Sequence, residues 1–225
     1  MKKYVFCVVA LAVGMSMMAQ TVYQKVTTNP TDWSGTYLIV CEGQCVVFNG
    51  AADEEHIDAK GGAAILSGIT FTDGVLAGTD ALDAATFTIS ASGDEDWPWA
   101  IQSASGLYIG HKDSVVADNG LSAETTLKNK CKHTLSIDEN GNLIATPKWT
   151  VGQAFNLQYN KKEEQQRFRY FLPEDKLAVQ LYKLQELGTD ITEIETSSYC
   201  KKSFENGRII INKNEYKYNL LGRKL

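Results

Sequence analysis

The chain has 225 residues, of which 22 are Lys or Arg and 27 are Asp or Glu, so its formal net charge at pH 7 is −5. An acidic chain is a poor match for the phosphate backbone of nucleic acid, and we therefore expect no nucleic-acid partner. The length suits one sizeable β domain with a short appendage, because single all-β domains reach roughly 200 to 250 residues.

The first 19 residues, MKKYVFCVVALAVGMSMMA, are typical of a cleaved export signal. Two lysines precede an apolar run that is too short to span a bilayer, and the small residue Ala19 precedes Gln20. We therefore expect residues 1–19 to be a signal peptide. The mature protein, with a net charge of 20 − 27 = −7, is expected in the periplasm, at the cell surface or outside the cell, with no membrane insertion after cleavage.

From residue 20 to residue 184, short runs rich in Val, Ile, Thr, Tyr and Phe alternate with Gly, Asp, Asn and Ser. This pattern predicts an all-β, antiparallel domain. Open sheet edges are usually removed by closing a barrel or by packing two sheets, and we expect a closed barrel here. Three similar segments beginning at Gly35, Gly106 and Gly141 leave a β-trefoil-like arrangement of three units open as an alternative. No window has a sustained helical period, so helices are expected to be short.

Two dipeptides predict tight hairpins. Asp73-Gly74 lies between the apolar runs at residues 69–71 and 75–77, and Asn140-Gly141 lies between two further strand-like runs. Both dipeptides suit the positive φ angles of tight turns. We therefore expect each dipeptide to join two paired strands.

Cys41 and Cys45 flank the three-residue segment Glu42-Gly43-Gln44. Export to an oxidising compartment permits disulfides, and a hairpin turn here would place the two cysteines across from each other. The sequence leaves two alternatives open for this pair, a disulfide or two separate thiols. Cys131 and Cys200 are then either paired or free.

After residue 184 the composition changes. Residues 185–199 contain four acidic side chains and few bulky groups, which predicts a linker. Residues 200–225 contain seven Lys or Arg against two Glu, and two strand-like runs flank a turn at Lys213-Asn214. They predict a small, basic β-hairpin tail. Because an isolated hairpin is marginal in water, we expect this tail to be docked or held by another protein.

Three passages of the chain resemble an uncharacterised exported β domain that is common in Bacteroides and Prevotella type bacteria. They are residues 33–40 (WSGTYLIV) with 47–50 (VFNG), residues 167–171 (RFRYF) with 179–183 (VQLYK), and residues 206–223. The last passage resembles a truncated type IX secretion sorting tail. The resemblance implies an exported location, and it implies no catalytic residue.

Aromatic residues beside acidic ones form the candidate ligand site. Trp97 and Trp99 follow Asp94 and Asp96 in the sequence. A tryptophan face can pack against the apolar CH surface of a sugar ring while carboxylates accept hydrogen bonds from its hydroxyls. The alternative is core packing, which is the commoner role of aromatic side chains in β domains.

No motif specifies a reaction, a metal or a cofactor. His56, His111 and His133 lack the local spacing of a metal site, and the acidic loop at residues 53–58 lacks the central glycine of a calcium loop. The chain has no Gly-x-Ser-x-Gly elbow. We therefore expect no catalytic residue, no metal and no cofactor.

Together these features favour an exported, non-enzymatic binding module for a glycan or a protein at the cell surface. Two alternatives stay open. One is a small secreted hydrolase of polysaccharide or peptide, with acids such as Asp94, Glu95 or Asp96 in its cleft. The other is a structural protein of the envelope or matrix, assembled through the tail. The sequence carries no signal for the oligomeric state.

Overall fold

The computed structural model describes residues 21–112, 119–148, 155–173 and 176–185, together with strands at residues 201–205, 208–213 and 216–219. The chain divides into two compact units, residues 1–186 and 187–225, and each is described by itself. The predicted signal peptide and residues 186–199 of the predicted linker lie outside the described residues.

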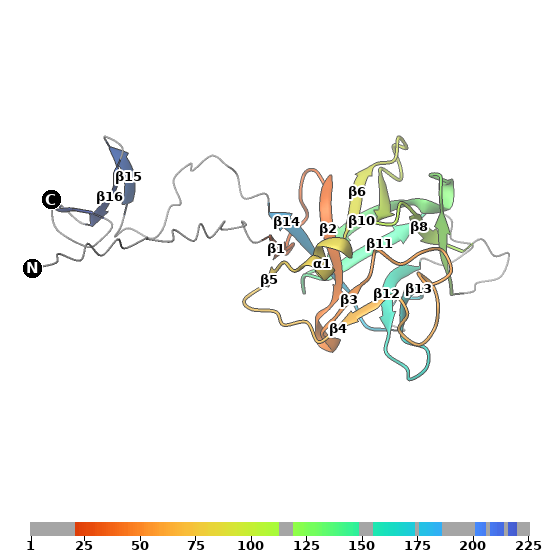
Figure 1. The fold of residues 1–225 in the computed structure, drawn as a ribbon. Helices are drawn as coiled ribbons and strands as arrows, with labels where there is room; N and C mark the ends of the chain where they lie inside the picture. The colour runs from red at the N-terminus through yellow and green to blue at the C-terminus, as the bar shows by residue number, and fades with distance from the viewer. Residues whose placement is uncertain are drawn as a thin grey trace, which may run out of the picture. The chain divides into compact units, whose positions relative to one another are not determined.

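The first unit is all-β and antiparallel, which confirms the predicted class (Figure 1). Its described strands are β1 (Val22–Lys25), β2 (Gly35–Cys41), β3 (Val46–Phe48), β4 (Ile65–Ser67), β5 (Val75–Ala77), β6 (Phe87–Ala91), β7 (Trp99–Ser103), β8 (Tyr108–His111), β9 (Leu121–Glu124), β10 (Lys132–Ile137), β11 (Leu143–Pro147), β12 (Asn156–Asn160), β13 (Arg167–Phe171) and β14 (Gln180–Gln185). Its described helical segments are α1 (Asp80–Ala84) and the 3-10 turns Glu42–Gln44 and Asn129–Cys131. None of these helices is long and apolar enough to cross a membrane.

Six strands pair one after another in this unit. β2 pairs with β6, β6 with β7, β7 with β10, and β10 with β11, while β14 pairs with the other edge of β2. Between β11 and the segment that enters β14, a single bridge is described, in which Leu143 N donates to Val179 O at 2.8 Å. Within the described residues, continuous strand pairing therefore does not close the sheet.

Three hairpins lie between these six strands in the sequence: β3–β4, β8–β9 and β12–β13. β3 also pairs with the end of β2, and β8 pairs with β7. The β12–β13 hairpin is a separate two-stranded sheet, and the bridges Gly120↔Tyr170 and Tyr159↔Leu177 tie it to its neighbours. This hairpin carries the candidate site described below.

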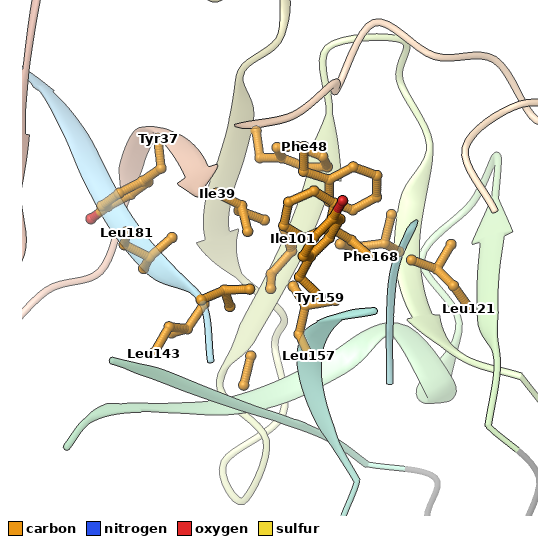
Figure 2. Close-up of a cluster of buried hydrophobic side chains, with 14 of the residues drawn as sticks. Tyr37, Ile39, Phe48, Ile101, Leu121, Leu143, Leu157, Tyr159, Phe168 and Leu181 are labelled. Carbon is orange, nitrogen blue, oxygen red and sulfur yellow. The ribbon is translucent and has the colours of Figure 1, made fainter. Parts of the chain in front are cut away.

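The main core lies where the strands and the hairpins meet (Figure 2). Phe48 of β3 stacks on Phe168 of β13 with ring centroids 4.8 Å apart, and Tyr159 of β12 packs against Phe168 at 4.9 Å. Ile39 of β2 and Leu181 of β14 belong to the same cluster. Each large apolar side chain buried in this way contributes roughly 1.5–3 kcal/mol. The inner face of the β12–β13 hairpin is thus part of the core.

β2 is buried on both faces, which explains its unbroken apolar run. Tyr37 and Ile39 belong to the main core, whereas Leu38 and Val40 belong to a second cluster with side chains from β1, β5, α1 and β14. Because β1 pairs with both β14 and β5, these added strands cover the second face of β2.

Both predicted tight turns are present, and one flanking strand is corrected. Asp73 and Gly74 have positive φ angles of 50° and 73°, and Val75 N donates to Thr72 O at 2.8 Å. Residues 69–71 do not form a strand, because β5 pairs with the edge of β1 instead. The Asn140-Gly141 turn joins β10 to β11 as predicted, with Gly141 at a φ of 76°.

The disulfide predicted as one alternative for Cys41 and Cys45 is not formed, and both are free cysteines. Cys41 ends β2 with its side chain in the main core, whereas Cys45 is exposed after the 3-10 turn at a φ of 52°. The two side chains therefore lie in opposite environments. Burial raises the pKa of the Cys41 thiol to about 11.

The second unit contains β15 (Lys201–Glu205), β16 (Arg208–Lys213) and β17 (Tyr216–Asn219), which form one antiparallel sheet. β16 and β17 are the predicted hairpin. β15 adds a third strand, with Ser203 opposite Ile210, so the predicted two-stranded tail is corrected to three strands. The signal for this strand was the Asn206-Gly207 dipeptide, which is typical of a tight hairpin.

Candidate ligand-binding site

The loop between β6 and β7 holds most of the residues predicted to bind a ligand. Asp94 accepts a hydrogen bond from Trp97 N at 3.2 Å and forms ion pairs with Lys132 at 3.3 Å and Lys148 at 2.5 Å. The hydrogen bond from Lys148 is the main cause that lowers the pKa of the Asp94 carboxyl to about 2. The Asp94 carboxylate is therefore already engaged by its own chain.

The other predicted site residues lie in three different settings. Asp96 is exposed, and Trp97 is half-buried with its carbonyl oxygen accepting from Ser92 Oγ at 2.5 Å. Trp99 is half-buried and packs against the main core, two residues from the core side chain of Ile101. The loop thus brings Asp94 and Trp97 together through the backbone, while Trp99 belongs to the edge of the core.

A second site lies on the outer face of the β12–β13 hairpin. Alternation along the paired strands places Leu157, Tyr159, Phe168 and Tyr170 toward the core, and their neighbours on the opposite face. On that outer face Arg167 stands opposite Asn160, and Arg169 stands opposite Gln158. The outer face therefore carries two guanidinium groups beside two amides.

A pocket with a volume of about 360 Å³ opens over this face. Four cationic side chains line it: Lys162, Arg167, Arg169 and Lys176. Three amide side chains, Asn119, Asn160 and Gln165, and the ring of Phe171 complete the lining. In a chain whose net charge is −5, this concentration of positive charge sets the pocket apart.

Arg169 is held in a fixed position. Its Nε donates to Asp58 Oδ1 and its Nη2 to Asp58 Oδ2, both at 2.5 Å, and its Nη1 donates to Asn119 O at 3.2 Å. A two-pronged pair of this kind fixes the plane of the guanidinium group. The acidic segment at residues 53–58, considered above as a calcium loop, thus supplies a counterion to the pocket wall.

Arg167 lies two residues earlier on the same face in a different situation. Its side chain is half-buried, and its Nε is buried without a hydrogen-bond partner among the described residues. Burial, reinforced by the nearby positive charge of Arg169, lowers the pKa of Arg167 from its usual value. A donor left in this state is costly, because it has lost water and gained no acceptor.

Hydrogen bonds also fix the remaining walls of the pocket. Gln158 Nε2 donates to Leu172 O at 2.8 Å, and its Oε1 accepts from Lys176 N at 2.9 Å. The Lys176 ammonium lies 5.4 Å from the ring centroid of Phe171. Because Phe171 is only 4% exposed, it serves as a wall and not as an open stacking platform.

The histidines do not form a metal centre in the described part of the chain, where no group of three or more His, Cys, Asp or Glu side chains could hold a metal ion. His133 is buried and lies 2.7 Å from the hydroxyl of Tyr170, and the ring of His111 packs on Phe155 at 4.5 Å. His56 lies at the surface, 2.6 Å from Asp53. Burial lowers the pKa of His133 to about 3, so this side chain is neutral near pH 7.

The pocket was not predicted from the sequence, although one feature of the sequence indicates it. The chain has only four arginines, and two of them stand at alternate positions of the strand-like run RFRYF. Alternation places both on one face of a strand. Comparison with known proteins adds nothing to this signal, since no family model, no curated protein and no solved structure matches the chain.

Proposed function

We propose that this chain is an exported, non-enzymatic binding module and that the basic pocket on the β12–β13 hairpin holds a glycan. The observation that carries the proposal is the pocket itself, where amide and cationic donors converge from separate segments of the chain. Its volume of about 360 Å³ lies within the range of small-ligand sites, roughly 300–1,000 Å³. Sugar hydroxyls both donate and accept hydrogen bonds, so they match amides and guanidinium groups together.

Fixed geometry supports a role in binding. Asp58 and Asn119 hold Arg169, and Gln158 ties the segment at Lys176 to β12. Behind the pocket, the stacked rings of Phe48 and Phe168 anchor the hairpin in the core. Donors that are immobile before the ligand arrives lose little entropy when it binds.

We also propose that the six paired strands form a closed barrel and that the domain is a β-trefoil. Its three units would be β2-β3-β4-β6, β7-β8-β9-β10 and β11-β12-β13-β14, each with two barrel strands around one hairpin. The order of the pairings and the bridge at Leu143 support this arrangement. β5 and α1 are an insertion in the first unit. Of the three similar sequence segments, those at Gly35 and Gly141 lead into the first strands of their units, β2 and β11, whereas the segment at Gly106 leads into β8. The pocket then belongs to the third unit.

Export is proposed from the sequence features of residues 1–19, and a sorting role for residues 200–225 is proposed from their resemblance to type IX tails. Cell fractionation of a strain that expresses a chain without residues 200–225 tests the sorting role. Retention of this chain in the periplasm supports the role. An unchanged location removes it.

The test of the function is a glycan array probed with the full chain and with two variants. Gln165→Ala/Lys176→Ala truncates two partly exposed pocket side chains, and Trp97→Ala truncates the sequence-predicted site. We expect specific hits that the double variant loses and that Trp97→Ala keeps. The reverse pattern would move the site to the β6–β7 loop, and an empty array would overturn glycan binding. Cleavage of any hit, followed by mass spectrometry, would make the chain a hydrolase.

A further inference from the structure

Positive charge predominates among the described side chains that line the pocket. Four cationic side chains line the pocket, and no carboxylate is among its described lining residues. The acidic side chain that reaches the pocket wall, Asp58, is bound to Arg169 by two hydrogen bonds. Glu163 and Glu164, in the turn of the hairpin, are exposed and do not line the pocket. An uncharged ligand would leave the charge of Arg167 without a counterion among the described lining residues.

The two arginines of the pocket differ in their hydrogen-bond acceptors. All three nitrogens of the Arg169 guanidinium have acceptors, at distances of 2.5 to 3.2 Å. Arg167, on the same face, has a buried Nε without an acceptor among the described residues. Both oxygens of Asp58 already accept from Arg169, and the Nε of Arg167 makes no hydrogen bond to Asp58.

From this contrast we propose that the ligand of the pocket is an anionic saccharide, and that Arg167 is the residue that receives its carboxylate or sulfate group. The inference rests on the proposed function, and it specifies the chemical class of the glycan. A guanidinium group presents a planar fork of donors that matches carboxylate and sulfate oxygens alike. Lys162 and Lys176 add positive charge around the same hollow.

The lowered pKa of Arg167 agrees with this assignment. Burial and the charge of Arg169 oppose the positive charge on Arg167, and together they outweigh the attraction of the Asp58 carboxylate. A bound anion acts in the opposite direction, because a nearby negative charge favours the charged form of a base. The amides of Asn119 and Gln165 line the same pocket and can meet the hydroxyls of the sugar ring, whereas the Oδ1 of Asn160 already accepts from Lys162 N at 3.1 Å.

Titration calorimetry of the full chain tests the proposal with matched tetrasaccharides. The probes are tetragalacturonate, its carboxyl-reduced neutral form, and a sulfated galactose tetramer. We expect at least one anionic probe to bind ten-fold or more tightly than the neutral form, and the preferred probe then distinguishes carboxylate from sulfate. Raising the salt concentration should weaken this binding, because ion pairs at a half-exposed site are screened.

Two pairs of variants assign the anion to its receptor. Arg167→Gln should lose ten-fold or more in affinity, whereas Arg167→Lys, which keeps the charge without the fork, should lose less. Lys162→Gln should weaken binding, and its neighbour Lys161→Gln, which is exposed and outside the pocket lining, should have little effect. Far-ultraviolet circular dichroism and the thermal midpoint establish that each variant is folded.

The outcomes separate this inference from the proposed function. If the neutral tetramer binds as well as the anionic ones, the anionic inference is wrong and the glycan module stands. If a pocket variant abolishes array hits while Arg167→Gln keeps full affinity for the anionic probe, the receptor assignment is wrong. If no saccharide binds and an acidic peptide does, both proposals fail.

Discussion

The β6–β7 loop and the basic pocket both set charged side chains beside aromatic rings, yet their charges are arranged in opposite ways. In the loop, the Asp94 carboxylate lies between the ammonium groups of Lys132 and Lys148 and also accepts from Trp97 N. In the pocket, Asp58 engages Arg169, while the Nε of Arg167 has no acceptor among the described residues. The Asp94 carboxylate of the loop is therefore paired within the chain. The pocket, by contrast, retains a buried hydrogen-bond donor without an acceptor among the described residues.

This difference shows that residue types alone do not locate a site. The acidic and aromatic loop has the composition that suits a sugar, but the fold engages its main carboxylate internally. The hairpin has a composition that suggests a solvated strand, but the fold half-buries its arginines. The useful criterion is which charged groups still lack partners after folding.

The largest effect is expected from Phe168→Ala, which tests whether the hairpin under the pocket is anchored by its inner face. Phe168 is 1% exposed and contacts the rings of Phe48 and Tyr159. Its truncation should lower the free energy of unfolding by about 3–5 kcal/mol, measured by urea denaturation. Arg167→Gln, one residue away on the outer face, is the matched control. A loss below about 1 kcal/mol for Phe168→Ala would show that the hairpin is not anchored in this way.

The next effect is a dependence of stability on pH that comes from His133. Its folded pKa of about 3 lies below the ordinary histidine value of about 6.5. As the pH falls from 6.5 toward 3, the unfolded state binds a proton that the folded state does not bind. Stability therefore falls across this window, by at most about 1.4 kcal/mol per pH unit.

His133→Gln isolates this contribution. The variant should show a flatter stability curve between pH 6.5 and 4.5, measured by urea denaturation at several pH values. Asp94 and Glu124 act in a lower window, because lysine partners lower the pKa of each carboxyl to about 2. Their contributions are present above about pH 4 and are lost as the pH falls through 2. Parallel curves for the variant and the original chain would contradict the role of His133.

The sequence predicts the strands far better than it predicts the pocket. Local signals were enough for the hairpin at Asn140-Gly141, since a turn dipeptide and two alternating runs determine it. The pocket depends on distant contacts, because Asp58 and Arg169 are 111 residues apart. Which arginine obtains that carboxylate is decided only when the chain is folded. The burial of Cys41 against the exposure of Cys45 is likewise set by the core and not by their spacing.

A smaller effect is expected from Asp94→Asn, which removes the internal counterion of the β6–β7 loop. The change leaves Lys132 and Lys148 close together without a negative partner, so the thermal midpoint should fall by a few degrees. Asp96→Asn, exposed and two residues away, removes the same charge and should leave the midpoint nearly unchanged. Binding of the anionic tetrasaccharide should survive both changes. Loss of binding in Asp94→Asn alone would restore the loop as the ligand site.

The smallest change in thermal midpoint is expected from Arg167→Gln. The direction of this change distinguishes the pocket from the loop, where the change should be a fall. Replacing this half-buried cation removes a desolvation penalty and a repulsion from Arg169, which together outweigh the lost attraction to Asp58, so the thermal midpoint should stay constant or rise slightly. Arg169→Gln, by contrast, leaves Asp58 without its partner and should lower the midpoint. A fall for Arg167→Gln as large as that for Asp94→Asn would mean that Arg167 is neutralised within the chain. The pocket would then be a structural ion network like the loop, and the anionic probe would stabilise the original chain no more than the variant.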